Sequence, residues 1–129
     1  MSDQPVHHNE ADVEWELDLE DAHREARVRT RRLLSSDVTP TSGVSVGTFE
    51  MPPGSANDPH HHEPPEVYYV IEGSGEVLLD EEWKPLSKGD VVFIPGGITH
   101  GTRNLGNGPC KIFWAFPVDS YEGIEYFMD

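Results

Sequence analysis

Basic charge is scarce in this chain of 129 residues. Nine lysines and arginines stand against 24 aspartates and glutamates, which gives a formal net charge of −15. A surface of this sign repels nucleic-acid phosphates and anionic lipid headgroups, so we expect neither nucleic acid nor a membrane as a partner. The composition is typical of a well-hydrated acidic protein, and adaptation to high salt is the alternative interpretation.

Cysteine and long apolar runs are scarce as well. Cys110 is the single cysteine, so an intrachain disulfide is excluded, and we expect this thiol to be a small core residue. Membrane helices need about 18 consecutive apolar residues, and the sequence contains no such stretch. The N-terminus also lacks the basic-then-apolar pattern of a signal peptide. We therefore expect one cytoplasmic domain.

Turn residues are abundant by comparison. The chain has 12 glycines and 11 prolines, mostly beyond residue 40 and in short clusters between apolar runs. This punctuation predicts an all-β domain, and Pro85 predicts an edge position for its strand. The aromatic tail over 121–129 is expected to add an edge strand or to cover one end of a barrel. The predicted strands cover 44–51, 66–71, 76–79, 83–86, 91–94, 100–104 and 110–116.

Residues 1–25 are predicted to form an acidic, partly disordered N-terminal extension, since they carry nine acids and one arginine. Alternate residues from Val13 to Leu19 are apolar and the others acidic, which predicts a strand with one apolar face at a sheet edge. Five arginines follow between Arg24 and Arg32. A helix and a strand compete there; we favour a short helix or turn over 20–25 and then a strand. We expect the arginines to pair with the preceding acids, within one chain or across a dimer.

Three consecutive histidines carry the clearest chemical signal. On an extended strand alternate side chains share a face, so His60 and His62 point the same way and His61 points the opposite way. Glu66 follows closely, and His100 is the remaining histidine of the predicted β region. Three imidazoles and one carboxylate suit a divalent transition metal rather than calcium or magnesium. The alternative is a surface histidine cluster that binds nothing.

The spacing of these residues resembles the two sequence motifs of the cupin family, with no departure. The match covers residues 54–104, and the flanking strands extend the likeness to about 40–116. The first motif reads Gly54, five residues, His60, one, His62, three, Glu66, six, Gly73, and the second reads Gly89, five, Pro95, one, Gly97, two, His100, three, Asn104.

The resemblance implies a fold, a metal site and an assembly. The fold is a jelly-roll β-barrel of six or eight strands, here over 26–129 with its motif core at 54–104. The resemblance assigns one divalent transition metal to His60, His62, Glu66 and His100. Iron or manganese is favoured, with nickel, zinc, copper and cobalt as alternatives. Small cupins of this kind are often homodimers, so we expect a homodimer.

Alternation also predicts the walls of a substrate pocket. Glu66 and Tyr68 share one strand face, and we expect both to be catalytic, as acid–base groups. An aromatic pocket beside a metal suits a small organic substrate. The residues predicted to line the pocket are Met51 (with Phe49 as the alternative at its opening), Tyr68, Arg103, Trp114 and Phe116. The alternatives are a salt bridge from Arg103 to a surface acid, and ordinary core packing for Trp114 and Phe116.

The leading functional expectation is a metal-dependent enzyme acting on a small organic molecule, most simply a dioxygenase-like oxygenase. Four protein ligands leave one or two coordination positions open on the metal, which permits binding of both O₂ and substrate. A lyase or isomerase that uses the metal as a Lewis acid is the first alternative. A non-catalytic cupin that binds a small ligand is the second.

Overall fold

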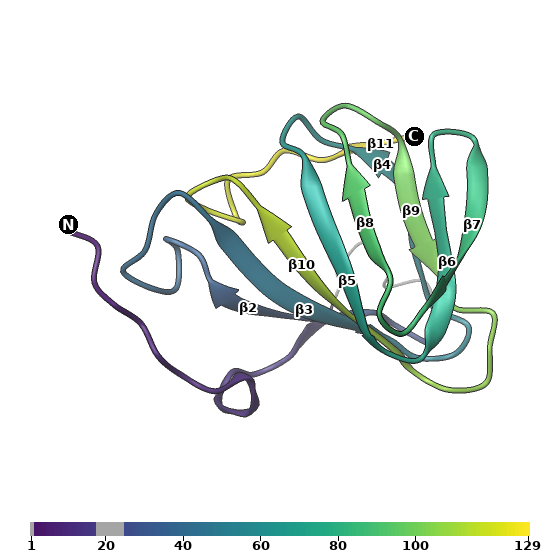
Figure 1. Cartoon of the computed structure of the whole chain (residues 1–129), viewed down its shortest axis with the longest axis horizontal. Helices are drawn as coiled ribbons and strands as arrows, with labels where there is room; N and C mark the ends of the chain where they lie inside the picture. The colour runs from purple at the N-terminus through teal and green to yellow at the C-terminus, as the bar shows by residue number, and fades with distance from the viewer. Residues whose placement is uncertain (1, 18–24) are drawn as a thin grey trace.

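The computed structural model describes residues 2–17 and 25–129, and these form two antiparallel sheets packed face to face (Figure 1). One sheet has six strands in the order β1-β2-β3-β10-β5-β8, and the other has five in the order β11-β4-β9-β6-β7. The strands are β1 (Glu16–Leu17), β2 (Arg29–Leu34), β3 (Ser45–Met51), β4 (Ala56–His61), β5 (Glu66–Glu72), β6 (Ser74–Leu79), β7 (Glu82–Ser87), β8 (Val91–Ile94), β9 (His100–Arg103), β10 (Cys110–Phe116) and β11 (Phe127–Met128).

The strands β3 to β10 supply four neighbouring strands to each sheet, so they form an eight-stranded jelly roll. The predicted all-β barrel is therefore confirmed, and β1, β2 and β11 extend it at sheet edges. The strand with Pro85 is also at an edge, as β7 is the last strand of its sheet. A central strand donates backbone N–H groups to neighbours on both of its sides. Proline has no backbone N–H to donate, which explains the edge position of its strand.

The core lies between the two sheets and follows the predicted alternation. Along β10 the odd-numbered side chains are partly exposed and the even-numbered ones, from Cys110 to Phe116, are buried. Along β5 the buried side chains are Glu66, Tyr68 and Val70, so this strand turns a carboxylate and a phenol inward. Burial raises the pKa of the Cys110 thiol to about 11, as expected for a core cysteine.

The N-terminal segment lies against the six-stranded sheet. The arginine run forms strand β2 and not the competing helix, and β1 pairs with it at the sheet edge. Arg31 lies 3.4 Å from Glu10 and Arg32 lies 3.2 Å from Glu16, so the predicted pairing of arginines with preceding acids is confirmed within one chain. The helix or turn predicted over 20–25 falls mostly on positions 18–24, which are outside the described residues.

The C-terminal tail crosses to the other sheet. Strand β11 pairs with β4 at His60 and His61, which confirms the predicted edge strand. A short 3-10 helix, η1 (Glu10–Asp12), precedes β1. Within residues 2–17 and 25–129, no helix is long and apolar enough to cross a membrane.

Candidate metal centre

The structure brings together the three histidines of the two motifs. His60 lies near the C-terminal end of β4, and His62 directly follows that strand. His100 is the first residue of the neighbouring strand β9. His60 and His100 are direct partners in the β4–β9 register. One ring nitrogen from each of the three histidines lies within 4.8 Å of the others, and all three side chains are buried. Strand pairing therefore places ligands that are 40 residues apart on one wall.

Backbone carbonyls fix the orientation of all three rings. In each ring Nδ1 lies at hydrogen-bond distance from a carbonyl oxygen two residues away. A carbonyl only accepts, so Nδ1 carries the ring proton and Nε2 keeps its lone pair. This is the arrangement that a metal-binding imidazole requires. The pairs are His60 with Asp58 at 2.7 Å, His62 with Pro64 at 2.8 Å and His100 with Ile98 at 2.9 Å.

Glu66 lies beside two of these three rings. Its Oε1 atom lies 3.2 Å from Nε2 of His62 and 3.4 Å from Nε2 of His100. Nε2 of His100 is buried and has no hydrogen-bond partner among the described residues, a costly arrangement for a polar atom. A metal ion at this point would satisfy that lone pair. Three nitrogens and a carboxylate oxygen form a donor set that fits a divalent transition metal.

The electrostatics of His60 also favour a metal. Burial lowers the pKa of this imidazole to about 4, and the neighbouring His100 contributes in the same direction. His60 is therefore neutral at physiological pH, so a metal does not have to displace a proton from it.

One of the three histidines, His60, borders a cavity of about 360 Å³ that opens to the surface. His60, Glu66, Tyr68 and Trp114 line it, together with Phe49. Tyr68 hydrogen-bonds Glu66, and burial together with that carboxylate raises the pKa of the phenol well above its usual value. Its hydroxyl is therefore held in the protonated form and donates to the carboxylate.

Three residues predicted to line the pocket are absent from the described lining of this cavity. Met51 is buried at the far end of β3, where it is paired with Cys110. Arg103 donates to Glu76 at 2.7 Å and lies over the ring of Trp83. Phe116 packs edge-on against His62, with 5.1 Å between ring centroids, and supports the imidazole from within the core.

Two tyrosines of the C-terminal tail were not predicted as site residues. The ring centroid of Tyr126 lies 5.3 Å from that of His60 and 5.2 Å from that of His62. Tyr126 hydrogen-bonds Tyr121, which stacks on Trp114 at 4.7 Å. Both tyrosines line the cavity, and burial raises the pKa of Tyr126. The aromatic composition of the tail was the signal that could have identified them.

Comparison with known proteins places this site in a family context. The family model of the cupin domain matches residues 47–116. Dimethylsulfoniopropionate lyase DddW of Ruegeria pomeroyi is 35% identical over 99 residues, which cover 77% of this chain and 64% of the lyase. The chain thus spans slightly less than two thirds of that relative.

Solved structures share the fold at lower identity. The polyketide cyclase RemF from Streptomyces resistomycificus superposes with a TM-score of 0.79 at 21% identity, over 97% of this chain and 85% of the cyclase. The dimethylsulfoniopropionate (DMSP) lyase DddQ from Ruegeria pomeroyi superposes with a TM-score of 0.74 at 24% identity, over 89% of this chain and 61% of that lyase. At these identities the likeness establishes the fold alone.

Proposed function

The chain belongs to the cupin family, and we propose that it is a metal-dependent lyase or isomerase that acts on a small organic acid. One observation carries the proposal: three buried imidazoles bring one ring nitrogen each within 4.8 Å of one another beside Glu66, and His60 and Glu66 line an open cavity. The oxygenase expectation gives way to its alternative, because the relatives described above are named as lyases and a cyclase.

The proposed metal ligands are His60, His62, Glu66 and His100. A divalent metal held there would supply a Lewis acid that polarises a substrate oxygen. The carboxylate of Glu66 brings a negative charge to the three neutral imidazoles, which offsets part of the charge of a dication. The carbonyl bonds to Nδ1 hold the rings in place before the metal arrives.

Glu66 and Tyr68 are the proposed proton-transfer pair. In an elimination, a proton leaves the carbon next to the substrate carboxylate, and the electron pair of that C–H bond forms a carbon–carbon double bond. The bond to the leaving group on the next carbon breaks, and the leaving group departs with its electron pair. The hydroxyl of Tyr68 donates to Glu66 and both side chains line the cavity. The oxygen of Tyr68 can therefore take the substrate proton while its own proton passes to the carboxylate of Glu66. An isomerase would return the proton to a different carbon.

The cavity walls favour a substrate that carries a cationic group. Carboxylates of Glu16, Asp58 and Glu66 outnumber the single arginine of the lining, Arg32. Aromatic faces attract cations, most strongly where water is excluded. The substrate named for the lyase relatives, dimethylsulfoniopropionate, has such a group. The aromatic lining residues are Phe49, Tyr68, Trp114, Tyr121 and Tyr126.

The experiment that tests this function combines metal analysis with turnover under argon and in air. The purified protein is stripped of metal, reloaded separately with iron, manganese, nickel and zinc, and incubated with dimethylsulfoniopropionate and other 3-substituted propionates. Proton NMR then follows formation of the unsaturated acid. We expect equal turnover in argon and in air, because elimination consumes no O₂.

Other outcomes would contradict the proposal. Consumption of O₂ in step with substrate would restore the oxygenase. Tight retention of a ligand without turnover would favour the non-catalytic binding module. The control is His62→Ala, loaded with the same metals, which should form no product above the protein-free background.

A further inference from the structure

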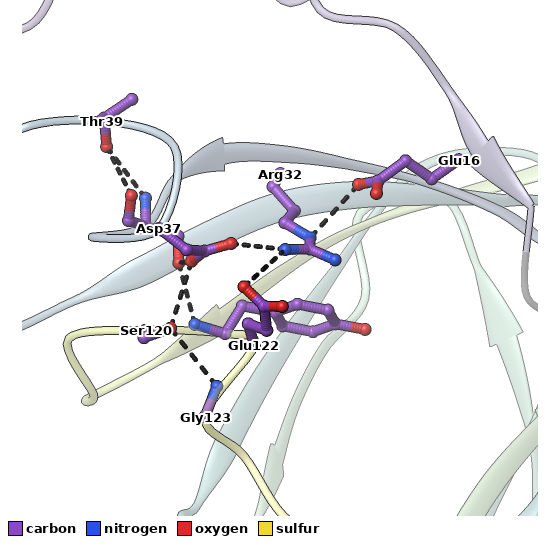
Figure 2. A network of polar contacts seen from close by, with 9 residues as sticks. Glu16, Arg32, Asp37, Thr39, Ser120, Glu122 and Gly123 are labelled. Carbon is purple, nitrogen blue, oxygen red and sulfur yellow. Dashed lines mark hydrogen bonds and ion pairs between the residues drawn. The ribbon is translucent and has the colours of Figure 1, made fainter.

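Arg32 joins three parts of the chain that are far apart in sequence (Figure 2). Its Nε atom lies 3.2 Å from a carboxylate oxygen of Glu16 in β1, and its Nη1 atom contacts Asp37 in the loop after β2. The same Nη1 atom lies 4.0 Å from Glu122 in the C-terminal tail. The guanidinium carbon also lies 5.3 Å from the ring centroid of Tyr121.

The alternation of β2 separates Arg32 from its neighbours. Arg29 and Arg31 point to one face, where both lie over the ring of Trp15, at 4.4 and 4.0 Å from its centroid. Thr30 and Arg32 point to the other face and line the cavity. Of the arginines in β2, Arg32 is thus the one that reaches the site.

The loop after β2 carries the contact on to the tail. Asp37, which contacts Arg32, also accepts a hydrogen bond from Ser120 Oγ at 3.2 Å. The backbone N–H of Tyr121 donates to Ser35 Oγ at 2.8 Å. The tail is therefore attached to this loop immediately before and at Tyr121, the residue that stacks on Trp114 and hydrogen-bonds Tyr126.

We propose that Arg32 is a positioning residue: by binding Glu16, Asp37 and Glu122 together, it holds the tail that carries Tyr121 and Tyr126 against the histidine site. Beyond this cluster the tail has no α-helix, and it is fixed at its far end by the two-residue strand β11 and by Asp129, whose backbone N–H donates to Pro59 and whose carboxylate contacts His61 and Thr99. Tyr121 lies at the Arg32 end of the segment between these two attachments, and it hydrogen-bonds Tyr126, whose ring contacts His60 and His62. Loss of the Arg32 contacts should therefore let Tyr121 move and weaken the packing of Tyr126 on the histidines. The expected effect on turnover rests on the proposed function, whereas the effect on the tail does not.

The charges of this cluster support a bound state of the tail. Burial by itself lowers the pKa of Arg32, but the hydrogen bond to Asp37 and the charge of Glu16 outweigh it and raise this pKa. Burial by itself raises the pKa of Asp37, and hydrogen bonds from Ser35 and Arg32 outweigh it and lower this pKa. Both groups are therefore charged across the neutral range and stay paired.

Hydrogen exchange followed by mass spectrometry tests the proposal without any assay of activity. The variant is Arg32→Gln, and the matched control is Arg29→Gln, which removes an arginine of the same strand that pairs with Glu50 at 2.6 Å. We expect exchange of the amides over 121–124 to become at least about tenfold faster in Arg32→Gln, with the barrel strands unchanged. Arg29→Gln should leave those amides at the wild-type rate.

A second pair of variants guards against a folding defect. Asp37→Asn removes the partner carboxylate and should loosen the same peptide, and Arg32→Lys, which keeps the charge but not the fork of donors, should restore part of the protection. With a substrate in hand, Arg32→Gln should lower kcat/KM while the metal content stays at the wild-type level. Wild-type protection of 121–124 in both Arg32→Gln and Asp37→Asn would overturn the proposal, and so would equal loosening of all strands. Failure of the wild-type protein to turn over any substrate would instead count against the proposed function.

Discussion

The Nδ1–H of His62 donates to the carbonyl oxygen of Pro64 at 2.8 Å, and this bond decides which nitrogen of the ring faces the site. Pro64 has a fixed φ angle, and Pro65 after it restricts its ψ angle, so the carbonyl that accepts this hydrogen bond belongs to a stiff piece of backbone. Nε2 is then left within 3.2 Å of Glu66. The site is preorganised in this sense: local backbone geometry aims the ring before any ligand binds.

Removing one of these rings should remove the metal and leave the barrel. We expect His62→Ala to bind divalent transition metal at least about 100-fold more weakly, because a direct ligand matters no less than the groups that orient it. The matched control is His61→Ala, since His61 points away and contacts Asp129. Elemental analysis of both proteins after gel filtration measures the effect. Full occupancy in His62→Ala would sink the assignment of the site.

The hydroxyl of Tyr68 should matter for turnover and not for metal. Tyr68→Phe keeps the buried ring but deletes the donor to Glu66, and we expect kcat to fall by roughly 10²- to 10⁴-fold at unchanged metal content. Tyr69→Phe is the matched control, because Tyr69 is the next residue of β5 and points outward. Steady-state kinetics on the metal-loaded proteins compares the two variants. Equal rates for Tyr68→Phe and wild type would exclude this phenol from proton transfer.

A methyl group at position 47 should destabilise the fold. A Cβ atom there would lie 2.1 Å from the carbonyl oxygen of Arg31 and 2.3 Å from Cζ2 of Trp114, so strands and cavity wall must shift to admit it. We expect Gly47→Ala to lower the free energy of unfolding by roughly 1–3 kcal/mol. Gly108→Ala, where nothing lies within 4 Å, is the control. Urea unfolding followed by tryptophan fluorescence gives both values; an unchanged midpoint for Gly47→Ala would contradict the packing.

The acidic segment should stabilise the barrel in a pH-dependent way. Burial by itself raises the pKa of Glu10, but hydrogen bonds from Lys111 and Thr48 outweigh it and lower this pKa. A depressed pKa contributes stability that is present above the pKa of the unfolded chain, about 4.3, and is lost as the pH falls through the folded value. We therefore expect Glu10→Gln to be less stable than wild type at pH 7, with the difference shrinking below about pH 4.

Thermal unfolding of the two proteins between pH 3 and pH 7 measures this difference. Glu14→Gln, a change at an exposed acid of the same segment, serves as the control and should follow the wild-type curve. A gap between Glu10→Gln and wild type that stays constant over the whole range would show that the carboxylate charge is not the cause.

Alternation along single strands predicted which side chains point inward, but not which of these inward side chains reach the cavity. Phe49 and Met51 lie on the same face of β3. Phe49 lines the cavity, whereas Met51 is buried where β3 pairs with Cys110 of β10. Two residues along a strand are about 6.6 Å apart, and a pattern of period two has no information on that displacement. Alternation likewise could not show whether Arg103 reaches the cavity. It does not line the cavity, and it pairs with Glu76.

The sequence by itself determined an all-β barrel and the candidate ligands, because turn residues, alternation and motif spacing are local properties of the chain. Only the tertiary structure decided that Tyr126 lies against His60 and that Arg32 contacts both Glu16 of the N-terminal segment and Glu122 of the C-terminal tail. These contacts join segments that share no local pattern. They arise from the way the two sheets close on each other, which depends on the packing of the whole chain.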